Sequence, residues 1–173
     1  MSGLPSPCTG TSTSNTSTCT PNTPGTYNIS VGVTDSVGNT TTATGTLVVS
    51  PALAVTLSIS PSKITLGQST TFTATVSGGT SPFTYSWTGL PAPCTSINSN
   101  TVTCTPNTAS TYTITVTVTD ATGATASASG TLTVTAPLTA TLAITPSTIT
   151  VGQSVTFTVT ASGGTPPYTY TWQ

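Results

Sequence analysis

The chain has 173 residues, of which 2% are charged: Lys63, Asp35 and Asp120 are the whole set, with no histidine, arginine or glutamate. One lysine cannot form the basic surface that binds nucleic acid, and no stretch approaches the roughly 18 consecutive apolar residues of a membrane span. Forty-nine residues are threonine, a β-branched residue that favours strands. The composition therefore predicts a strand-rich protein that has no nucleic-acid partner and no membrane span.

Strands are predicted where apolar residues alternate with threonine or serine, because successive side chains of a strand point to opposite faces of the sheet. In chain order, this pattern predicts strands at residues 55–59, 70–77, 83–87, 111–119, 132–134 and 155–159. Turn residues lie between the apolar runs, at 35–38, 67–68, 78–79 and 120–123. Short strands at this spacing, without helical periodicity, indicate a β-sandwich.

The sequence also repeats itself with a period of about 85 residues, a length that corresponds to a whole domain rather than to one turn of a solenoid. Ser-Gly-Gly-Thr begins at Ser77 and again at Ser162, and an aromatic–hydroxyl–Trp triplet ends at Trp87 and again at Trp172. Similar matches extend over nearly the whole chain. The chain is therefore expected to contain tandem copies of one domain.

The run at 77–87, Ser-Gly-Gly-Thr-Ser-Pro-Phe-Thr-Tyr-Ser-Trp, is followed at 111–123 by Thr-Tyr-Thr-Ile-Thr-Val-Thr-Val-Thr-Asp-Ala-Thr-Gly. Together these runs resemble the PKD-like and bacterial or archaeal immunoglobulin-like repeats of surface proteins. The resemblance covers the full repeat unit. It implies an all-β fold of tandem immunoglobulin-like (PKD-like) β-sandwich repeats, each of about 85 residues, in an extracellular or cell-surface protein.

The repeat divides the chain into three predicted segments. Residues 2–53 correspond to the C-terminal half of an immunoglobulin-like repeat, 54–137 to a complete repeat, and 138–173 to the N-terminal half of a repeat. Half a sandwich exposes an apolar sheet face and unpaired strand edges. Neighbouring repeats of a longer array, strand complementation between chains, or closure within one chain or a swapped dimer would each cover them. The first two arrangements both describe a filament.

Four cysteines allow three disulfide pairings. Repeat symmetry selects Cys8 with Cys19 and Cys94 with Cys104, and two such bonds indicate an oxidising compartment. The alternative is four free, buried thiols. A zinc site is disfavoured because the spacing is not that of a CxxC pair and there is no histidine.

Few residues are suited to chemistry or to metal binding. Asp35 and Asp120 occupy equivalent turns in different repeats, where they are expected to accept turn hydrogen bonds; a weak calcium site is the alternative, although calcium prefers six to eight oxygens. Trp87 and Trp172 are expected in the sandwich core, with a sugar-stacking platform as the alternative. Lys63 lacks the catalytic acid that an isopeptide bond needs. No catalytic residue, metal ligand or cofactor is predicted.

Three asparagines lie in glycosylation sequons: Asn15, Asn28 and Asn39. Asn28 alternates with apolar neighbours and is therefore expected to face solvent. Sequons occur easily by chance in so hydroxyl-rich a chain, and outward threonines offer sites for O-linked sugars.

These observations predict a protein that is not an enzyme. The expected function is that of a structural repeat of an extracellular filament, stalk or surface layer, whose end segments are completed by neighbouring repeats or chains. The expected partner is therefore the protein itself, in a tandem array or homopolymer, and glycans are possible further partners. An adhesive or carbohydrate-binding surface module is the alternative, and a passive spacer beside an enzyme is a third possibility. Stability is expected to change little between about pH 2 and pH 8, because few groups titrate.

Overall fold

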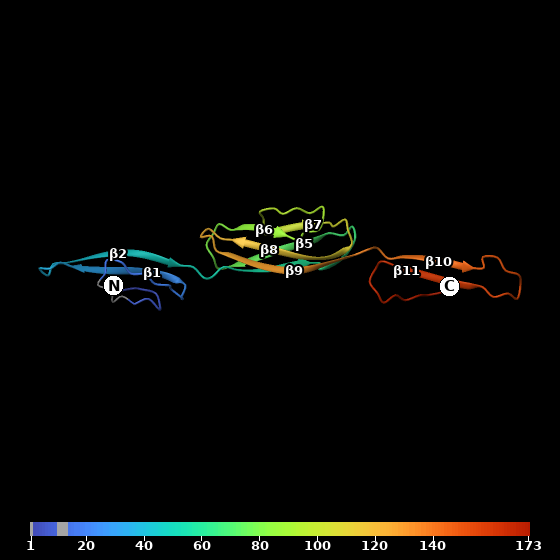
Figure 1. Cartoon of the computed structure of the whole chain (residues 1–173), viewed down its shortest axis with the longest axis horizontal. Helices are drawn as coiled ribbons and strands as arrows, with labels where there is room; N and C mark the ends of the chain where they lie inside the picture. The colour runs from blue at the N-terminus through green and yellow to red at the C-terminus, as the bar shows by residue number, and fades with distance from the viewer. Residues whose placement is uncertain (1, 10–13) are drawn as a thin grey trace. The chain divides into compact units, whose positions relative to one another are not determined.

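The computed structural model describes residues 2–9 and 14–173 and contains strands, turns and loops in these ranges (Figure 1). The strands are β1 (Gly25–Thr34), β2 (Thr40–Val49), β3 (Ala54–Ser60), β4 (Lys63–Thr65), β5 (Thr70–Ser77), β6 (Thr84–Thr88), β7 (Thr101–Cys104), β8 (Ser110–Thr119), β9 (Thr125–Thr135), β10 (Thr139–Thr145) and β11 (Thr156–Ser162). The all-β prediction is confirmed. Among the described residues, no helix has the length and apolar character needed to cross a bilayer.

Two compact units make up the chain. The first consists of the residues up to Ala54 together with the loops Ser77–Phe83 and Asp120–Ala124. The second consists of Val55–Val76, Thr84–Thr119 and Thr125–Gln173. Below, residues 2–53 are called the N-terminal segment, 54–137 the middle segment and 138–173 the C-terminal segment.

The middle segment forms two sheets. One has the strand order β3-β5-β7 and the other the order β4-β9-β8-β6. Strand β4 pairs in parallel with β9, whereas β5–β7, β6–β8 and β8–β9 are antiparallel. The strands of its N-terminal half, β3 to β6, therefore contribute to both sheets, and so do β7 to β9 of its C-terminal half. Three pairings join the two halves: β4–β9, β5–β7 and β6–β8.

Alternation along these strands places the apolar side chains between the two sheets. The buried apolar side chains are Ile64, Phe72, Ala74, Trp87, Val102, Cys104, Ile114, Val116, Val118, Leu132 and Val134. The threonines of β8 that follow Ile114, Val116 and Val118 are only partly buried. Complete burial of one large apolar side chain stabilises a fold by roughly 1.5–3 kcal/mol, so this set forms the core of a sandwich.

The polar groups within this core have partners. The Trp87 Nε1–H donates to the Ser99 carbonyl oxygen at 2.9 Å, and the buried Thr70 hydroxyl donates to the Pro61 carbonyl oxygen at 2.7 Å. No buried side-chain nitrogen or oxygen of the described residues lacks a hydrogen bond. Trp87 thus anchors the loop after β6 as well as filling the core.

The sheets approach closely at Gly130 on β9. A Cβ added at this glycine would lie 2.9 Å from Cδ1 of Ile59 on β3. No larger residue fits there without a shift, because real Cβ contacts are longer than this. Gly130 therefore serves as a hole for Ile59.

The N-terminal segment contains the hairpin β1–β2. Its register runs from Gly25 opposite Val49 to Thr34 opposite Thr40. The hairpin β8–β9 has the same ten-pair register one repeat later, from Ser110 opposite Val134 to Thr119 opposite Thr125. The two hairpins are therefore counterparts in structure as well as in sequence.

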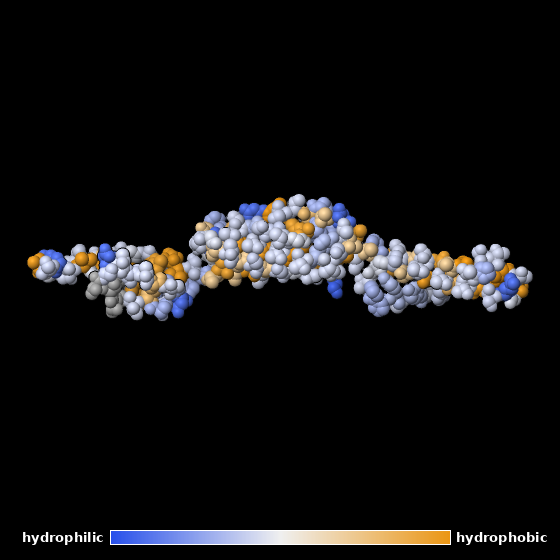
Figure 2. Space-filling model, in the orientation of Figure 1, coloured by the Kyte–Doolittle hydropathy of each residue, from blue (hydrophilic) through white to orange (hydrophobic). Residues whose placement is uncertain are grey.

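The C-terminal segment contains the hairpin β10–β11, with Thr139 opposite Ser162 and Thr145 opposite Thr156. By its place in the repeat, β10 corresponds to β3, and β11 corresponds to β5. Figure 2 shows hydrophobic residues at the surface of both end segments and few strongly hydrophilic residues on the visible face.

Candidate interaction faces of the end segments

The two aspartates act as turn residues. Oδ1 of Asp120 accepts hydrogen bonds from the Thr122 N–H, the Thr122 hydroxyl and the Ala124 N–H, and Oδ2 accepts one from the Thr80 N–H at 2.9 Å. The hydrogen bond from the Thr122 side chain is the largest cause that lowers the pKa of Asp120 below its ordinary value. Both oxygens are engaged, as expected for a turn.

Asp35 differs from Asp120 at both oxygens, because Val37 stands in the place of Thr122 and has no hydroxyl to donate to Oδ1, and because Oδ2 has a different donor. Its Oδ1 accepts from the N–H groups of Val37 and Asn39, and its Oδ2 accepts from the Asn39 side-chain amide at 2.8 Å. That side-chain hydrogen bond is the largest cause that lowers the pKa of Asp35. The amide thus takes the place that the Thr80 N–H has beside Asp120. The described residues contain no group of three or more His, Cys, Asp and Glu that could hold a metal ion.

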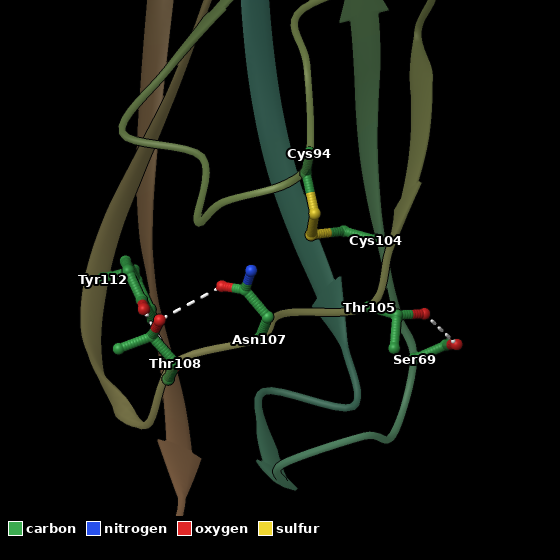
Figure 3. The surroundings of a disulfide bond; sticks show 7 residues. All are labelled: Ser69, Cys94, Cys104, Thr105, Asn107, Thr108 and Tyr112. Atoms are coloured by element: carbon green, nitrogen blue, oxygen red, sulfur yellow. Dashed lines mark hydrogen bonds between the residues drawn. A yellow bond between two sulfur atoms is a disulfide. The ribbon is translucent and has the colours of Figure 1, made fainter.

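Both predicted cysteine pairs are bonded in the structure. Cys8 and Cys19 have Cα atoms 5.5 Å apart, and Cys94 and Cys104 have Cα atoms 5.6 Å apart. Figure 3 shows the second bond joining the loop before Cys94 to the end of β7. The bonded cysteines are 11 residues apart in the first pair and 10 residues apart in the second.

A tyrosine hydrogen bond also recurs in both copies. The Tyr112 hydroxyl donates to the carbonyl oxygen of Thr108, four residues earlier, at 2.9 Å (Figure 3). The Tyr27 hydroxyl donates to the Thr23 carbonyl oxygen over the same distance. A tyrosine that bonds back to the preceding backbone is a hallmark of immunoglobulin-like sandwiches.

The three sequon asparagines are exposed. Asn28 accepts a 3.2 Å hydrogen bond from the Thr46 hydroxyl through Oδ1. The amide nitrogen of Asn39 is engaged with Asp35. Glycosylation at Asn15, Asn28 and Asn39 stays a prediction.

The N-terminal segment carries an open apolar groove. A cavity of about 520 Å³ lies against the inner face of the β1–β2 hairpin and the disulfide loop, and a second hollow of about 370 Å³ continues along the hairpin. The apolar residues that line them include Leu4, Ile29, Val31, Ala43 and Leu47. The counterparts of Ile29, Val31 and Leu47 are Ile114, Val116 and Leu132, which are fully buried in the middle segment. The same face is therefore open in one copy and covered in the other.

Gly45 is one of the residues that line the second hollow. It is the counterpart of Gly130, but nothing lies within 4 Å of a Cβ added to Gly45. The hole that Ile59 fills in the middle segment is therefore empty here. Sequence reasoning did not single out this glycine, although its place in the repeat was a usable signal.

The C-terminal segment carries the complementary kind of surface. Phe157 and Trp172 are 50% and 59% exposed, whereas their counterparts Phe72 and Trp87 are 0% and 3% exposed. The prediction of a core position holds for Trp87 and is wrong for Trp172, because the hairpin that would cover this face is not part of the segment. The aromatic pair is nevertheless formed, with ring centroids 6.1 Å apart against 6.3 Å for Phe72 and Trp87.

Comparison with known proteins agrees with this architecture. Residues 54–135 match the PKD domain family, and residues 156–173 match the SprB repeat family. The first match coincides with the two-sheet sandwich of the middle segment. The chain thus contains PKD-like, immunoglobulin-like repeats, as the sequence predicted. Comparison with curated proteins gives no match.

Several solved structures resemble the chain. The PKD domain of human KIAA0319 is 19% identical, over 48% of this chain and 80% of that one, with a TM-score of 0.37. The N-terminal four Ig domains of Dscam1 isoform 9.44 are 21% identical, over 64% and 27% of the two chains, with a TM-score of 0.40. The ectodomain of mouse nectin-like molecule 4 is 15% identical, over 64% and 50%, with a TM-score of 0.39.

Proposed function

We propose that this chain is a structural repeat of an extracellular filament, stalk or surface layer, and that its end segments are half-repeats completed by neighbouring repeats or chains. The observation that carries the proposal is the contrast between copies. The residues that form the core of the middle segment have counterparts on open faces in both end segments. A module of this kind transmits load through sheets and disulfides and needs no reactive group.

Two further features support an extracellular place for this repeat. Disulfides persist in oxidising compartments, and both cysteine pairs are bonded. PKD and SprB repeat matches suggest an extracellular surface module. A surface rich in threonine hydroxyls with 2% charged residues remains neutral over a wide pH range, which suits a passive structural role outside the cell.

Immunogold labelling of intact source cells tests this function. Antibodies against residues 54–137 are expected to decorate fibres, stalks or a continuous surface coat without permeabilisation. Preimmune serum and serum adsorbed with the purified chain serve as controls. Labelling that occurs only after the cells are opened would overturn the proposal.

The exposed aromatic side chains favour a second candidate, a carbohydrate-binding surface module. Tyr170 and Trp172 are more than half exposed, and aromatic faces of this kind stack on sugar rings. A glycan array probed with the chain would show binding that is lost in Trp172→Ala. If no glycan on the array binds the chain, the carbohydrate-binding function is ruled out and the structural function is the remaining candidate.

A further inference from the structure

We propose that the groove of the N-terminal segment is a docking site for the C-terminal segment of a second copy of this chain, with Ile144 of one copy seated over Gly45 of the other. This inference deepens the proposed structural function, on which it rests, by naming the partner and the register. The middle segment is the template, because it packs the same two halves together within one chain.

The first argument is the match of knob and hole. Ile144 is the counterpart of Ile59 one repeat later, lies on the inner face of β10 and is 44% exposed. Ile59 fills the space over Gly130, and the space over the counterpart Gly45 is empty. The groove therefore lacks the side chain that the C-terminal segment presents.

The second argument is the set of strand edges. In the middle segment, pairings of three, four and five residues join the halves through β4–β9, β5–β7 and β6–β8. Transferred to the repeat counterparts in the end segments, these pairings place Ile149 opposite Val49, Phe157 opposite Ser17 and Trp172 opposite Val31. The docked segment thus adds strands to both sides of the β1–β2 hairpin, a form of β-strand addition.

The third argument is that one edge is already held in the required register. Ser2 exchanges two backbone hydrogen bonds with Ser30, at 3.0 and 3.1 Å. By repeat position Ser2 corresponds to Thr88, which pairs with Thr115 in the middle segment. Ser2 holds the place opposite Ser30 that Gln173 would take in the transferred pairing, so the docked strand would pair with β1 only as far as Trp172 opposite Val31.

The fourth argument concerns charge and hydrogen bonding. The C-terminal segment contains no charged side chain, so it brings no side-chain charge into the groove when it docks. Thr165 is the counterpart of Thr80, and its N–H would reach Oδ2 of Asp35 as the Thr80 N–H reaches Asp120. Docking would thus cover the apolar faces and supply the hydrogen bond for which Asn39 now substitutes.

A contact of this type joins different surfaces of successive copies and can therefore continue without closing. Light scattering of the purified chain is expected to show a mass that rises with concentration. Because the docked segment has no charged side chain and Asp35 would meet an N–H rather than an opposite charge, the rise is expected to be nearly the same at about 50 mM and about 500 mM salt. A wild-type chain that stays monomeric at every concentration would overturn the docking while leaving the surface labelling, and thus the proposed function, unaffected.

Two variants test the knob and the hole. Gly45→Leu places a side chain in the hole, where its Cβ would have nothing within 4 Å, and Ile144→Asp places a charge on the docked face. Each variant alone is expected to lose association. The matched controls are Gly32→Thr, on the outer face of β1 where the middle segment has Thr117, and Ala143→Asp, on the outer face of β10. Both controls are expected to associate as the wild type does.

An equimolar mixture of Gly45→Leu and Ile144→Asp is the decisive measurement. It pairs the unaltered C-terminal segment of one variant with the unaltered groove of the other, so its outcome does not depend on how the altered segments fold. A one-to-one dimer that grows no further is the expected result. A mixture that remains monomeric, or single variants that associate like the wild type, would overturn the proposal.

Discussion

The middle segment and the end segments have nearly the same amino-acid pattern, but apolar side chains that are buried in the middle segment are exposed in the end segments. Phe72 and Trp87 are buried between two sheets, whereas Phe157 and Trp172 form the same aromatic pair on an open face. Ile59 fills the space over Gly130, whereas the space over Gly45 is empty. Each end segment therefore has the apolar residues of one half of a sandwich repeat. Those residues are buried only where the other half of the repeat packs against them.

The largest contrast is expected for the two tryptophans. Trp87→Ala should destabilise the middle segment by about 3–5 kcal/mol, because it opens a cavity in the core and removes the hydrogen bond to Ser99. In monomeric protein, Trp172→Ala should change unfolding of the same segment by less than about 0.5 kcal/mol. Urea unfolding followed by circular dichroism measures both, and equal effects would contradict the assignment of an open and a closed copy.

The disulfides provide the next contrast. The double variant Cys94→Ser with Cys104→Ser is expected to destabilise the middle segment by about 3 kcal/mol, because a loop of this size loses its constraint in the unfolded chain. The same change at Cys8 and Cys19 is expected to leave the main unfolding transition in place. Thermal unfolding of both double variants checks this, and a main transition that falls only when Cys8 and Cys19 are removed would reverse the comparison.

A smaller effect is expected at the recurring tyrosine. Tyr112→Phe removes one hydrogen bond to the Thr108 backbone and should cost about 1 kcal/mol in the middle segment. Tyr27→Phe makes the same change in a hairpin that lies outside the closed sandwich and serves as the matched control. Urea midpoints compare the two variants, and a larger loss for Tyr27→Phe would show that the N-terminal hairpin is part of the main folding unit.

The smallest expected effect is that of pH. Hydrogen bonds lower the pKa of Asp120 in the folded chain, so its contribution to stability is present above the unfolded value of about 3.9 and is lost as the pH falls through the folded value. The melting temperature should be nearly constant from about pH 8 to pH 5 and should decrease slightly below about pH 4. Asp120→Asn should remove most of that decrease; a steep acid transition in this variant would contradict the role given to Asp120.

Much of the fold follows from local pattern. The alternation around Ile114, Val116 and Val118 predicts β8 within a residue of its bounds, and the repeat predicts the bonded cysteine pairs. The first half of β9 lacks large apolar residues and forms a strand because Ala126 and Ala128 pair with β8. Strand β7 is four residues long and forms beside β5. Such strands depend on partners that alternation alone does not identify.

The amino-acid pattern alone establishes an all-β chain of immunoglobulin-like repeats with two short disulfide loops, because threonine-rich alternation and a domain-length period are local and repetitive signals. The tertiary structure was needed to show which copy of each apolar residue is buried. It was also needed to show that β4 runs parallel to β9 and that the space over Gly45 is empty. The reason is that burial and pairing are properties of two contacting surfaces. Phe72 and Phe157 have similar neighbours in sequence and different neighbours in space.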